Sequence, residues 1–267
     1  MFGSLRSTGA GQPLLLLHPN GFCAGLFEPL VRALDGAYRA IAVDLRGHGA
    51  SDAPTDAAGY AFVELARDVV AVLDAMSLER VVALGQSLGG GVAALVDRER
   101  PGLIERMLLC EAVAFPLLDP PTGGPMSDTA RRRRAHWTDR PAMIAAYRTK
   151  PPLSELAPDA LDAYVRWGTI GEPDGTVRLA CSPETEAIIF EISTTPHGAP
   201  AAFEHLDSLG APATVLAGDR SYLPREFFTA QAERVGTDLV LVTGGHFMVQ
   251  EDARRAAGWV REYLTPP

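Results

Sequence analysis

The sequence feature that most constrains the fold is a serine between two glycines, in Gly85-Gln86-Ser87-Leu88-Gly89. The apolar run Val81 to Leu84 precedes this motif, and a stretch compatible with a helix, Gly90 to Leu95, follows it. A Gly-x-Ser-x-Gly motif between a strand and a helix makes a strained turn with little room for side chains beside the serine. This context favours a nucleophilic Ser87 over a serine that only caps the helix.

The helix that follows Ser87 also offers a place for negative charge. Its N-terminus provides unpaired backbone N–H groups and the positive end of the helix dipole. We therefore predict that the backbone N–H of Leu88 is the first donor to an oxyanion formed at Ser87.

Short apolar runs alternate with longer amphipathic segments along the chain, which is typical of parallel strands joined by helices. The predicted strands are Leu14 to Leu17, Ala40 to Val43, Val81 to Leu84, Met107 to Cys110, Thr214 to Ala217 and Leu239 to Val242. The pattern predicts an α/β fold with a mostly parallel central sheet and helices on both faces.

A segment of different composition, residues 115–200, interrupts this alternation. It is rich in proline, arginine and aromatic residues, and its helical patterns run over Ser127 to Trp137, Pro141 to Arg148 and Asp159 to Trp167. We predict a helical cap over 115–200, inserted into a core made of 1–114 and 201–267. The basic run Arg131 to Arg134 is interpreted as a solvated face of a cap helix.

Composition narrows the class of partner. The net charge of −9 argues against a surface for nucleic acid or anionic membranes, which would need a dense basic face. Three scattered cysteines are too few for a disulfide framework, and no apolar stretch approaches the roughly twenty residues of a membrane span. We expect a cytoplasmic protein that acts on a neutral or weakly polar small molecule.

Motifs for cofactor chemistry are missing from the sequence. It contains no Cys-x-x-Cys pair, no His-Glu-x-x-His helix signature and no phosphate-binding Gly-x-x-x-x-Gly-Lys loop. We therefore expect neither a metal nor a cofactor.

Four segments together carry a resemblance to a known family. They are Leu14-Leu15-Leu16-Leu17-His18-Pro19-Asn20-Gly21-Phe22, Asp44-Leu45-Arg46-Gly47-His48-Gly49-Ala50-Ser51-Asp52, the Ser87 motif, and Gly244-Gly245-His246. Their order and spacing resemble those of the α/β-hydrolase family over nearly the whole chain. The resemblance implies the α/β-hydrolase fold, with N-terminal strands shortened or missing because only about a dozen residues precede the Leu14 run.

The resemblance also implies the general base. His246 follows the predicted strand Leu239 to Val242 across Thr243-Gly244-Gly245, which is the loop where the family places its histidine. His18 and His48 are interpreted instead as hydrogen-bonding residues of neighbouring loops.

The second oxyanion donor departs from the family pattern. Most members have His-Gly after the third strand, but here His18 is followed by Pro19, which has no N–H to donate. By position Asn20 is the first candidate, through its backbone N–H or its side-chain amide, and Phe22 is the alternative because Gly21 allows the loop to shift. The other interpretation is that Asn20-Gly21 forms only a tight turn.

The acid is the second departure. In the family it follows the seventh strand in a Gly-x-x-Asp arrangement, but Gly218-Asp219-Arg220-Ser221 has Ser221 at that position. Some members place a glutamate at the end of the sixth strand, where this chain has Glu111. A buried carboxylate there is costly unless it is paired, and a histidine N–H is a fitting partner. We prefer Glu111 as the acid and keep Asp219 as the alternative.

These residues predict a serine hydrolase that cleaves a carboxylic ester or lactone through an acyl-enzyme. The alternatives are carbon–carbon bond hydrolysis or perhydrolysis on the same triad, and a slow-turnover, receptor-like ligand-binding protein. Dehalogenase and epoxide hydrolase activities are disfavoured because both need an aspartate at the position of Ser87.

The cap is expected to roof the pocket and to set substrate shape. The candidate substrate-binding residues are Phe22, Trp137, Tyr147, Trp167, Phe247 and Met248. The sequence leaves open the physiological substrate and the choice between a monomer and a homodimer, although an exposed sheet edge would favour dimer contacts.

Overall fold

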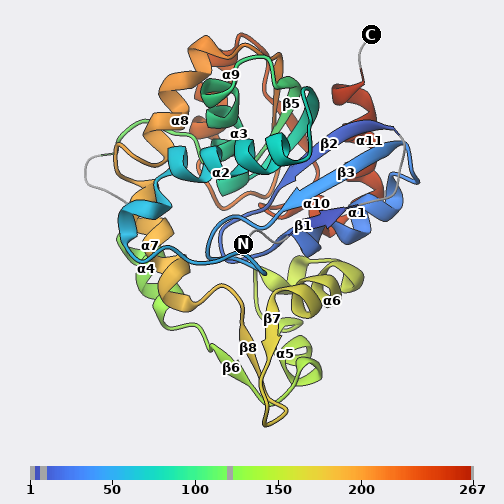
Figure 1. Ribbon diagram of the computed structural model, residues 1–267, viewed down its shortest axis with the longest axis vertical. Coiled ribbons are helices and arrows are strands. Elements are labelled where there is room, and N and C mark those ends of the chain that lie inside the picture. The colour runs from blue at the N-terminus through green and yellow to red at the C-terminus, as the bar shows by residue number, and fades with distance from the viewer. Residues whose placement is uncertain (1–3, 7–10, 119–122, 266–267) are drawn as a thin grey trace.

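The computed structural model describes residues 4–6, 11–118 and 123–265. Within these ranges the central sheet has seven strands in the order β1-β3-β2-β4-β5-β9-β10 (Figure 1). The strands are β1 (Ser4–Arg6), β2 (Gln12–Leu17), β3 (Tyr38–Val43), β4 (Val81–Gln86), β5 (Ile104–Cys110), β9 (Ala213–Gly218) and β10 (Val240–Val242). All neighbours pair in parallel except β1, which lies antiparallel to β3 at one edge.

The strands are where the apolar runs predict them, and the mostly parallel sheet with helices on both faces is confirmed. Before β2 the described residues contain the three-residue strand β1.

Helices cover both faces of this sheet. One face carries α2 (Phe62–Ala75), α3 (Leu88–Glu99), α8 (Ala199–His205) and α9 (Arg225–Val235), and the other carries α1 (Glu28–Ala33), α10 (Met248–Glu251) and α11 (Ala253–Leu264) (Figure 1). Side chains alternate along each strand. Leu15 and Leu17 therefore pack against the helices of the α2 and α3 face, while Leu14 and Leu16 pack against those of the α1 and α11 face. The sheet is thus buried on both faces, as parallel sheets require.

The segment between β5 and β9 forms most of the lower part of the molecule in Figure 1. It contains α4 (Gly123–Arg131), α5 (Arg140–Tyr147), α6 (Pro158–Trp167) and α7 (Pro183–Ser193). Three short antiparallel strands join them, in the order β6 (His136–Trp137), β8 (Val177–Leu179) and β7 (Thr169–Gly171).

The expected helix over Ser127 to Trp137 is wrong in its second half. Helix α4 ends at Arg131, and His136 and Trp137 pair with β8 instead. The backbone N–H of Leu179 donates to the carbonyl of Ala135, so the strand pairing takes up backbone groups that a helix would have used. Residues 123–193, called the inserted segment below, are therefore mainly helical and contain a small sheet.

No helix in the described ranges is both long enough and apolar enough to span a bilayer.

Candidate active site

Ser87 lies on the turn between β4 and α3, with φ 54° and ψ −120°. A left-handed φ is strained for a residue with a side chain, and it is maintained here by tight packing. A Cβ on Gly89 would lie 2.1 Å from the carbonyl oxygen of Leu17, and one on Gly85 would lie 2.4 Å from that of Gly89. The glycines on either side of the serine are therefore required by the close approach of the helix to the sheet.

Two hydrogen bonds join Ser87, His246 and Glu111 in a row. Nε2 of His246 is 3.0 Å from Oγ of Ser87, and Nδ1 of His246 is 3.0 Å from Oε2 of Glu111. An ionised carboxylate only accepts, so Nδ1–H donates to Glu111 and Nε2 is left to accept the hydroxyl proton of Ser87. All three side chains are buried, Glu111 completely.

The Glu111 carboxylate has its remaining hydrogen bonds with the end of β9. Its Oε1 accepts the backbone N–H of Gly218 at 2.7 Å, and its Oε2 also accepts the hydroxyl of Ser221 at 2.5 Å. Glu111 itself has φ 50°, and its backbone N–H donates to the carbonyl of Leu216. With Nδ1–H of His246, the Glu111 carboxylate accepts from three donors, and its burial is compensated with no arginine or lysine among them.

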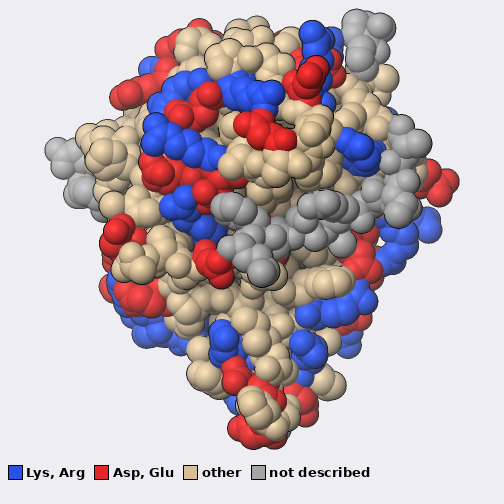
Figure 2. Space-filling model, in the orientation of Figure 1, with Lys and Arg blue, Asp and Glu red and all other residues tan. Residues whose placement is uncertain are grey.

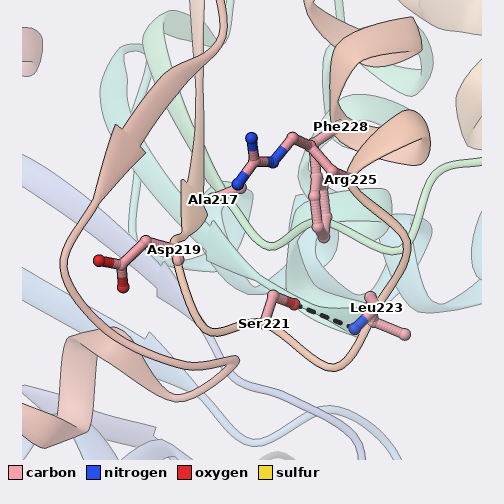
Figure 3. Close-up of a pocket in the computed structure, with 7 residues that line it drawn as sticks. Ala217, Asp219, Ser221, Leu223, Arg225 and Phe228 are labelled. Carbon is pink, nitrogen blue, oxygen red and sulfur yellow. Dashed lines mark hydrogen bonds between the residues drawn. The ribbon is translucent and has the colours of Figure 1, made fainter.

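Asp219, the alternative acid, is engaged elsewhere. Its Oδ1 accepts the backbone N–H of Gly244 at 3.0 Å and lies 3.5 Å from Nη1 of Arg220. In Figure 3 its side chain points away from Ser221. The structure therefore places Asp219 as an anchor of the loop before His246 and brings Glu111, not Asp219, into contact with the imidazole.

A cavity of about 170 Å³ lies at the end of β9 (Figure 3). It is lined by Ala217, Gly218, Asp219, Ser221, Leu223, Arg225 and Phe228. Gly218 and Ser221 donate hydrogen bonds to Glu111. The cavity therefore lies next to the residues that contact Glu111, and neither Ser87 nor His246 lines it.

The predicted oxyanion donors both have unoccupied N–H groups. In the described structure the backbone N–H of Leu88 and that of Asn20 donate to no protein acceptor. The N–H of Phe22 donates to the carbonyl of Pro19 at 3.3 Å, and that of Gly21 donates to Nε2 of His48 at 3.0 Å. The geometry thus favours Asn20 over Phe22 as the partner of Leu88.

His18 and His48 form hydrogen bonds with this loop and its neighbour, as the sequence predicts. Nε2 of His18 accepts the N–H of Leu45 at 3.0 Å while Nδ1 lies 2.8 Å from the carbonyl of Pro19. Burial lowers the pKa of His18 to about 4 and that of His48 to about 3. Both rings are therefore neutral acceptors at pH 7, which is what a backbone N–H donor requires.

Four of the six candidate substrate-binding residues meet in one apolar cluster. Phe22, Trp137, Tyr147 and Phe247 are buried together between the inserted segment and the core. The ring of Phe247 lies 5.1 Å from that of His246 and 5.0 Å from that of Phe22. This cluster therefore reaches the imidazole.

The other two lie outside that cluster. Trp167 is 49% exposed, and its indole N–H donates to Glu28 at 2.9 Å. Met248 packs into the core on the α11 side of the sheet. The structure thus directs the indole of Trp167 toward Glu28 and the side chain of Met248 toward the sheet, and contact of either residue with a substrate stays a prediction.

Two further residues at the site are not among those predicted from the sequence. The ring of Tyr222 lies 4.9 Å from that of His246, tilted by 49°; its position directly after Ser221 is the one signal that could have found it. Arg133 belongs to the run interpreted as solvated, yet its guanidinium is mostly buried against Glu186 of α7. That interpretation is wrong for Arg133, because its guanidinium is enclosed by Glu186, Tyr147 and Tyr164.

Comparisons with known proteins agree with this arrangement. A family model described as alpha/beta hydrolase fold matches residues 12–162, which is more than half of the chain. Among curated relatives, a serine hydrolase-like protein of Danio rerio is 33% identical over 113 residues, covering 42% of this chain and 35% of that protein. The chain thus spans about a third of the length of the curated relatives that it matches first.

Solved structures show the same fold over the whole length. E-2-(acetamidomethylene)succinate hydrolase superposes with a TM-score of 0.81 at 19% identity, covering 99% of both chains. The enol-lactonase of Burkholderia xenovorans LB400 superposes with a TM-score of 0.71 at 20% identity, covering 100% of this chain and 96% of that one.

Proposed function

The chain belongs to the alpha/beta hydrolase fold family, and from this premise we propose that it is a serine hydrolase of carboxylic esters or lactones. The observation that carries the proposal is the unbroken hydrogen-bonded row from Ser87 through His246 to Glu111. Nucleophile, base and orienting acid are the groups that acyl transfer through a covalent intermediate requires.

The first half of the reaction forms an acyl-enzyme. Nε2 of His246 takes the proton of Ser87 as Oγ attacks the ester carbonyl, and Glu111 stabilises the imidazolium that results. The negative charge on the carbonyl oxygen is accepted by the backbone N–H groups of Leu88 and Asn20. Collapse of this intermediate breaks the ester bond, and His246 returns the proton to the leaving alkoxide.

The second half of the reaction hydrolyses the acyl-enzyme and regenerates the free enzyme. A water molecule gives one proton to His246 and its oxygen attacks the acyl carbon, and the same two N–H groups accept the charge. Collapse releases the carboxylic acid and restores the hydroxyl of Ser87 with the proton held by His246. Every proton that moves in either half therefore passes through Nε2 of His246.

The apolar cluster of Phe22, Trp137, Tyr147 and Phe247 is proposed as the wall for the acyl part of the substrate. Its contact with the His246 ring through Phe247 places apolar surface beside the reacting atoms. An apolar acyl chain or lactone ring gains about 25 cal/mol for each Å² buried there.

The proposal is tested with p-nitrophenyl esters of increasing acyl length and lactones of increasing ring size, with Ser87→Ala as the blank. We expect saturable turnover that the Ser87→Ala variant lacks, and stoichiometric labelling of the native protein by a fluorophosphonate probe. Stoichiometric labelling without turnover would favour the receptor-like alternative. Absence of labelling would contradict a nucleophilic Ser87.

A further inference from the structure

The loop that carries the proposed second oxyanion donor is held by three hydrogen bonds. The side-chain amide of Asn20 donates to the backbone carbonyl of Glu186 at 2.9 Å. The hydroxyl of Tyr164 donates to the carbonyl of Gly21 at 3.2 Å, and the N–H of Gly21 donates to His48. Two of these three contacts come from the inserted segment, through α6 and α7.

A buried ion pair backs these contacts. Arg133 pairs through Nη1 with the carboxylate of Glu186, and its Nη2 lies 2.9 Å from Oη of Tyr164 and 3.3 Å from Oη of Tyr147. The two charged side chains are 19% and 10% exposed, so each would be costly to bury without the other.

The guanidinium also decides which way the hydroxyl of Tyr164 points. Arginine only donates, so Oη of Tyr164 accepts from Arg133 and must direct its own hydrogen elsewhere. The carbonyl of Gly21 is the acceptor that receives it. Burial raises the pKa of the Tyr164 hydroxyl, which keeps the proton available for this bond.

The ion pair of Arg133 and Glu186 also packs directly against the loop at Gly21. Gly21 has φ +78°, and a Cβ there would lie 2.8 Å from Cδ of Glu186 and 3.0 Å from Nη1 of Arg133. The ion pair therefore lies directly against the backbone of Gly21, in the space that a side chain at this position would occupy.

We propose that Arg133, Glu186 and Tyr164 form a positioning network that holds the backbone N–H of Asn20 on the oxyanion. The inference rests on the proposed function and deepens it, since it makes assembly of the oxyanion site depend on the inserted segment. The three residues act through Asn20 and Gly21 and are positioning residues, not catalytic ones. The basic run thus contains one internal member with a function in the site.

The test uses Tyr164→Phe, which removes one hydroxyl, together with the paired variant Arg133→Met/Glu186→Met, which removes both charges at once. Matched controls are Arg131→Gln and Glu184→Gln, since these residues pair with each other on the exposed surface of α4 and α7. For each variant we would measure the melting temperature, kcat, KM and the affinity for a boronic acid that mimics the tetrahedral intermediate.

Tyr164→Phe is expected to lower kcat by about 10- to 100-fold, a part of the 10²- to 10³-fold effect of losing an oxyanion donor. KM should change by less than about threefold, and affinity for the boronic acid should fall in parallel with kcat/KM. The paired variant should melt close to the native protein yet remain slow, because replacing a whole buried pair preserves stability without restoring the position of the loop. The controls should match the native enzyme.

Native kcat and boronic acid affinity in a folded Tyr164→Phe variant would overturn the inference, as would a rise confined to KM. Full kcat in the paired variant would overturn it equally, because the ion pair would then serve stability alone. These outcomes differ from failure of the proposed function, in which the native protein itself would neither turn over esters nor react with the fluorophosphonate.

Discussion

At the scale of single residues, the carboxylate that contacts His246 comes from the end of β5, and the end of β9 still contacts that carboxylate. Ser221 stands where the resemblance implies a carboxylate, and its hydroxyl donates to the carboxylate of Glu111 instead. The end of β9 thus contributes a donor to the acid, and the end of β5 contributes the acid itself. The imidazole meets a carboxylate in either arrangement.

Exchange of each carboxylate for its amide separates the two candidates. Glu111→Gln should lower kcat by about 10³- to 10⁴-fold, because the amide cannot hold His246 in the required tautomer or stabilise its charged form. Asp219→Asn should stay within a few-fold, since its partners are Gly244 and Arg220. Steady-state kinetics with one ester suffice, and the reverse ranking would return the role of acid to Asp219.

The two buried histidines give the protein a pH-dependent stability. The unfolded chain binds a proton to His18 below about pH 6.5, whereas the folded chain does so only below about pH 4. Between these values the unfolded state binds more protons, so the free energy of unfolding falls as pH falls. At about 1.4 kcal/mol per pKa unit, His18 alone contributes about 3 kcal/mol that is present above pH 6.5 and lost by pH 4.

Urea unfolding between pH 4 and pH 8 measures this dependence. His18→Gln should lower stability at pH 7 and flatten its fall toward acid, because one of the protonation sites is removed. His136→Gln, at an exposed position, is the control and should leave the slope unchanged. An unchanged slope in the His18 variant would show that other groups set the acid limit.

The sequence identified site residues where local patterns are sufficient. Ser87 and His246 each follow a strand in a short glycine-containing motif, so neighbours in the chain mark their surroundings. No comparable motif surrounds Arg133 or Tyr222 in the sequence. The four consecutive arginines are alike in sequence, and only the packing of α7 and α6 against the loop after α4 decides which is buried.

At the scale of elements, strands were easier to predict than the ends of cap helices. A buried parallel strand is a continuous apolar run, and its signal lies within its own residues. The two-residue strand β6 depends on β8, some forty residues later in the chain, and carries no such signal. Long-range pairing therefore overrode the helical pattern of Ser127 to Trp137.

Two glycine-to-alanine changes, one beside Ser87 and one in an exposed helix, test how the turn at Ser87 is packed. Gly89→Ala should destabilise the protein by several kcal/mol, because the new methyl group overlaps the carbonyl of Leu17 on β2. Gly258→Ala should stabilise it by about 1 kcal/mol, since Gly258 lies exposed within α11 and a Cβ there meets nothing within 4 Å. Thermal melts of both variants measure the contrast, and equal effects would contradict the packing described for α3.

At the scale of the whole molecule, acidic residues outnumber basic ones. Figure 2 shows basic and acidic side chains interspersed on the face viewed, and the chain as a whole carries −9. Near the site, the positive charge of Arg133 is matched by Glu186. We therefore expect the field at the site to follow the net charge and to disfavour anionic substrates.

Ionic strength tests this expectation. The value of kcat/KM for an anionic hemisuccinate ester should rise by about threefold between 0.01 and 0.3 M NaCl, because the Debye length falls from about 30 Å to less than 10 Å and repulsion is screened. A neutral ester of similar length should show no such rise. A fall for the anionic ester would mean that Arg133 acts on substrate as an unmatched cation.

The Glu186→Gln variant supplies the opposite case in the same assay. It leaves the guanidinium of Arg133 without its carboxylate, so the ratio of anionic to neutral ester turnover should increase and should now decrease with added salt. The ratio is the informative quantity, because any loss of kcat from displacement of Asn20 affects both esters alike. A ratio that stays at the native value would show that the charge of Arg133 does not reach the substrate, which would limit its role to holding the loop.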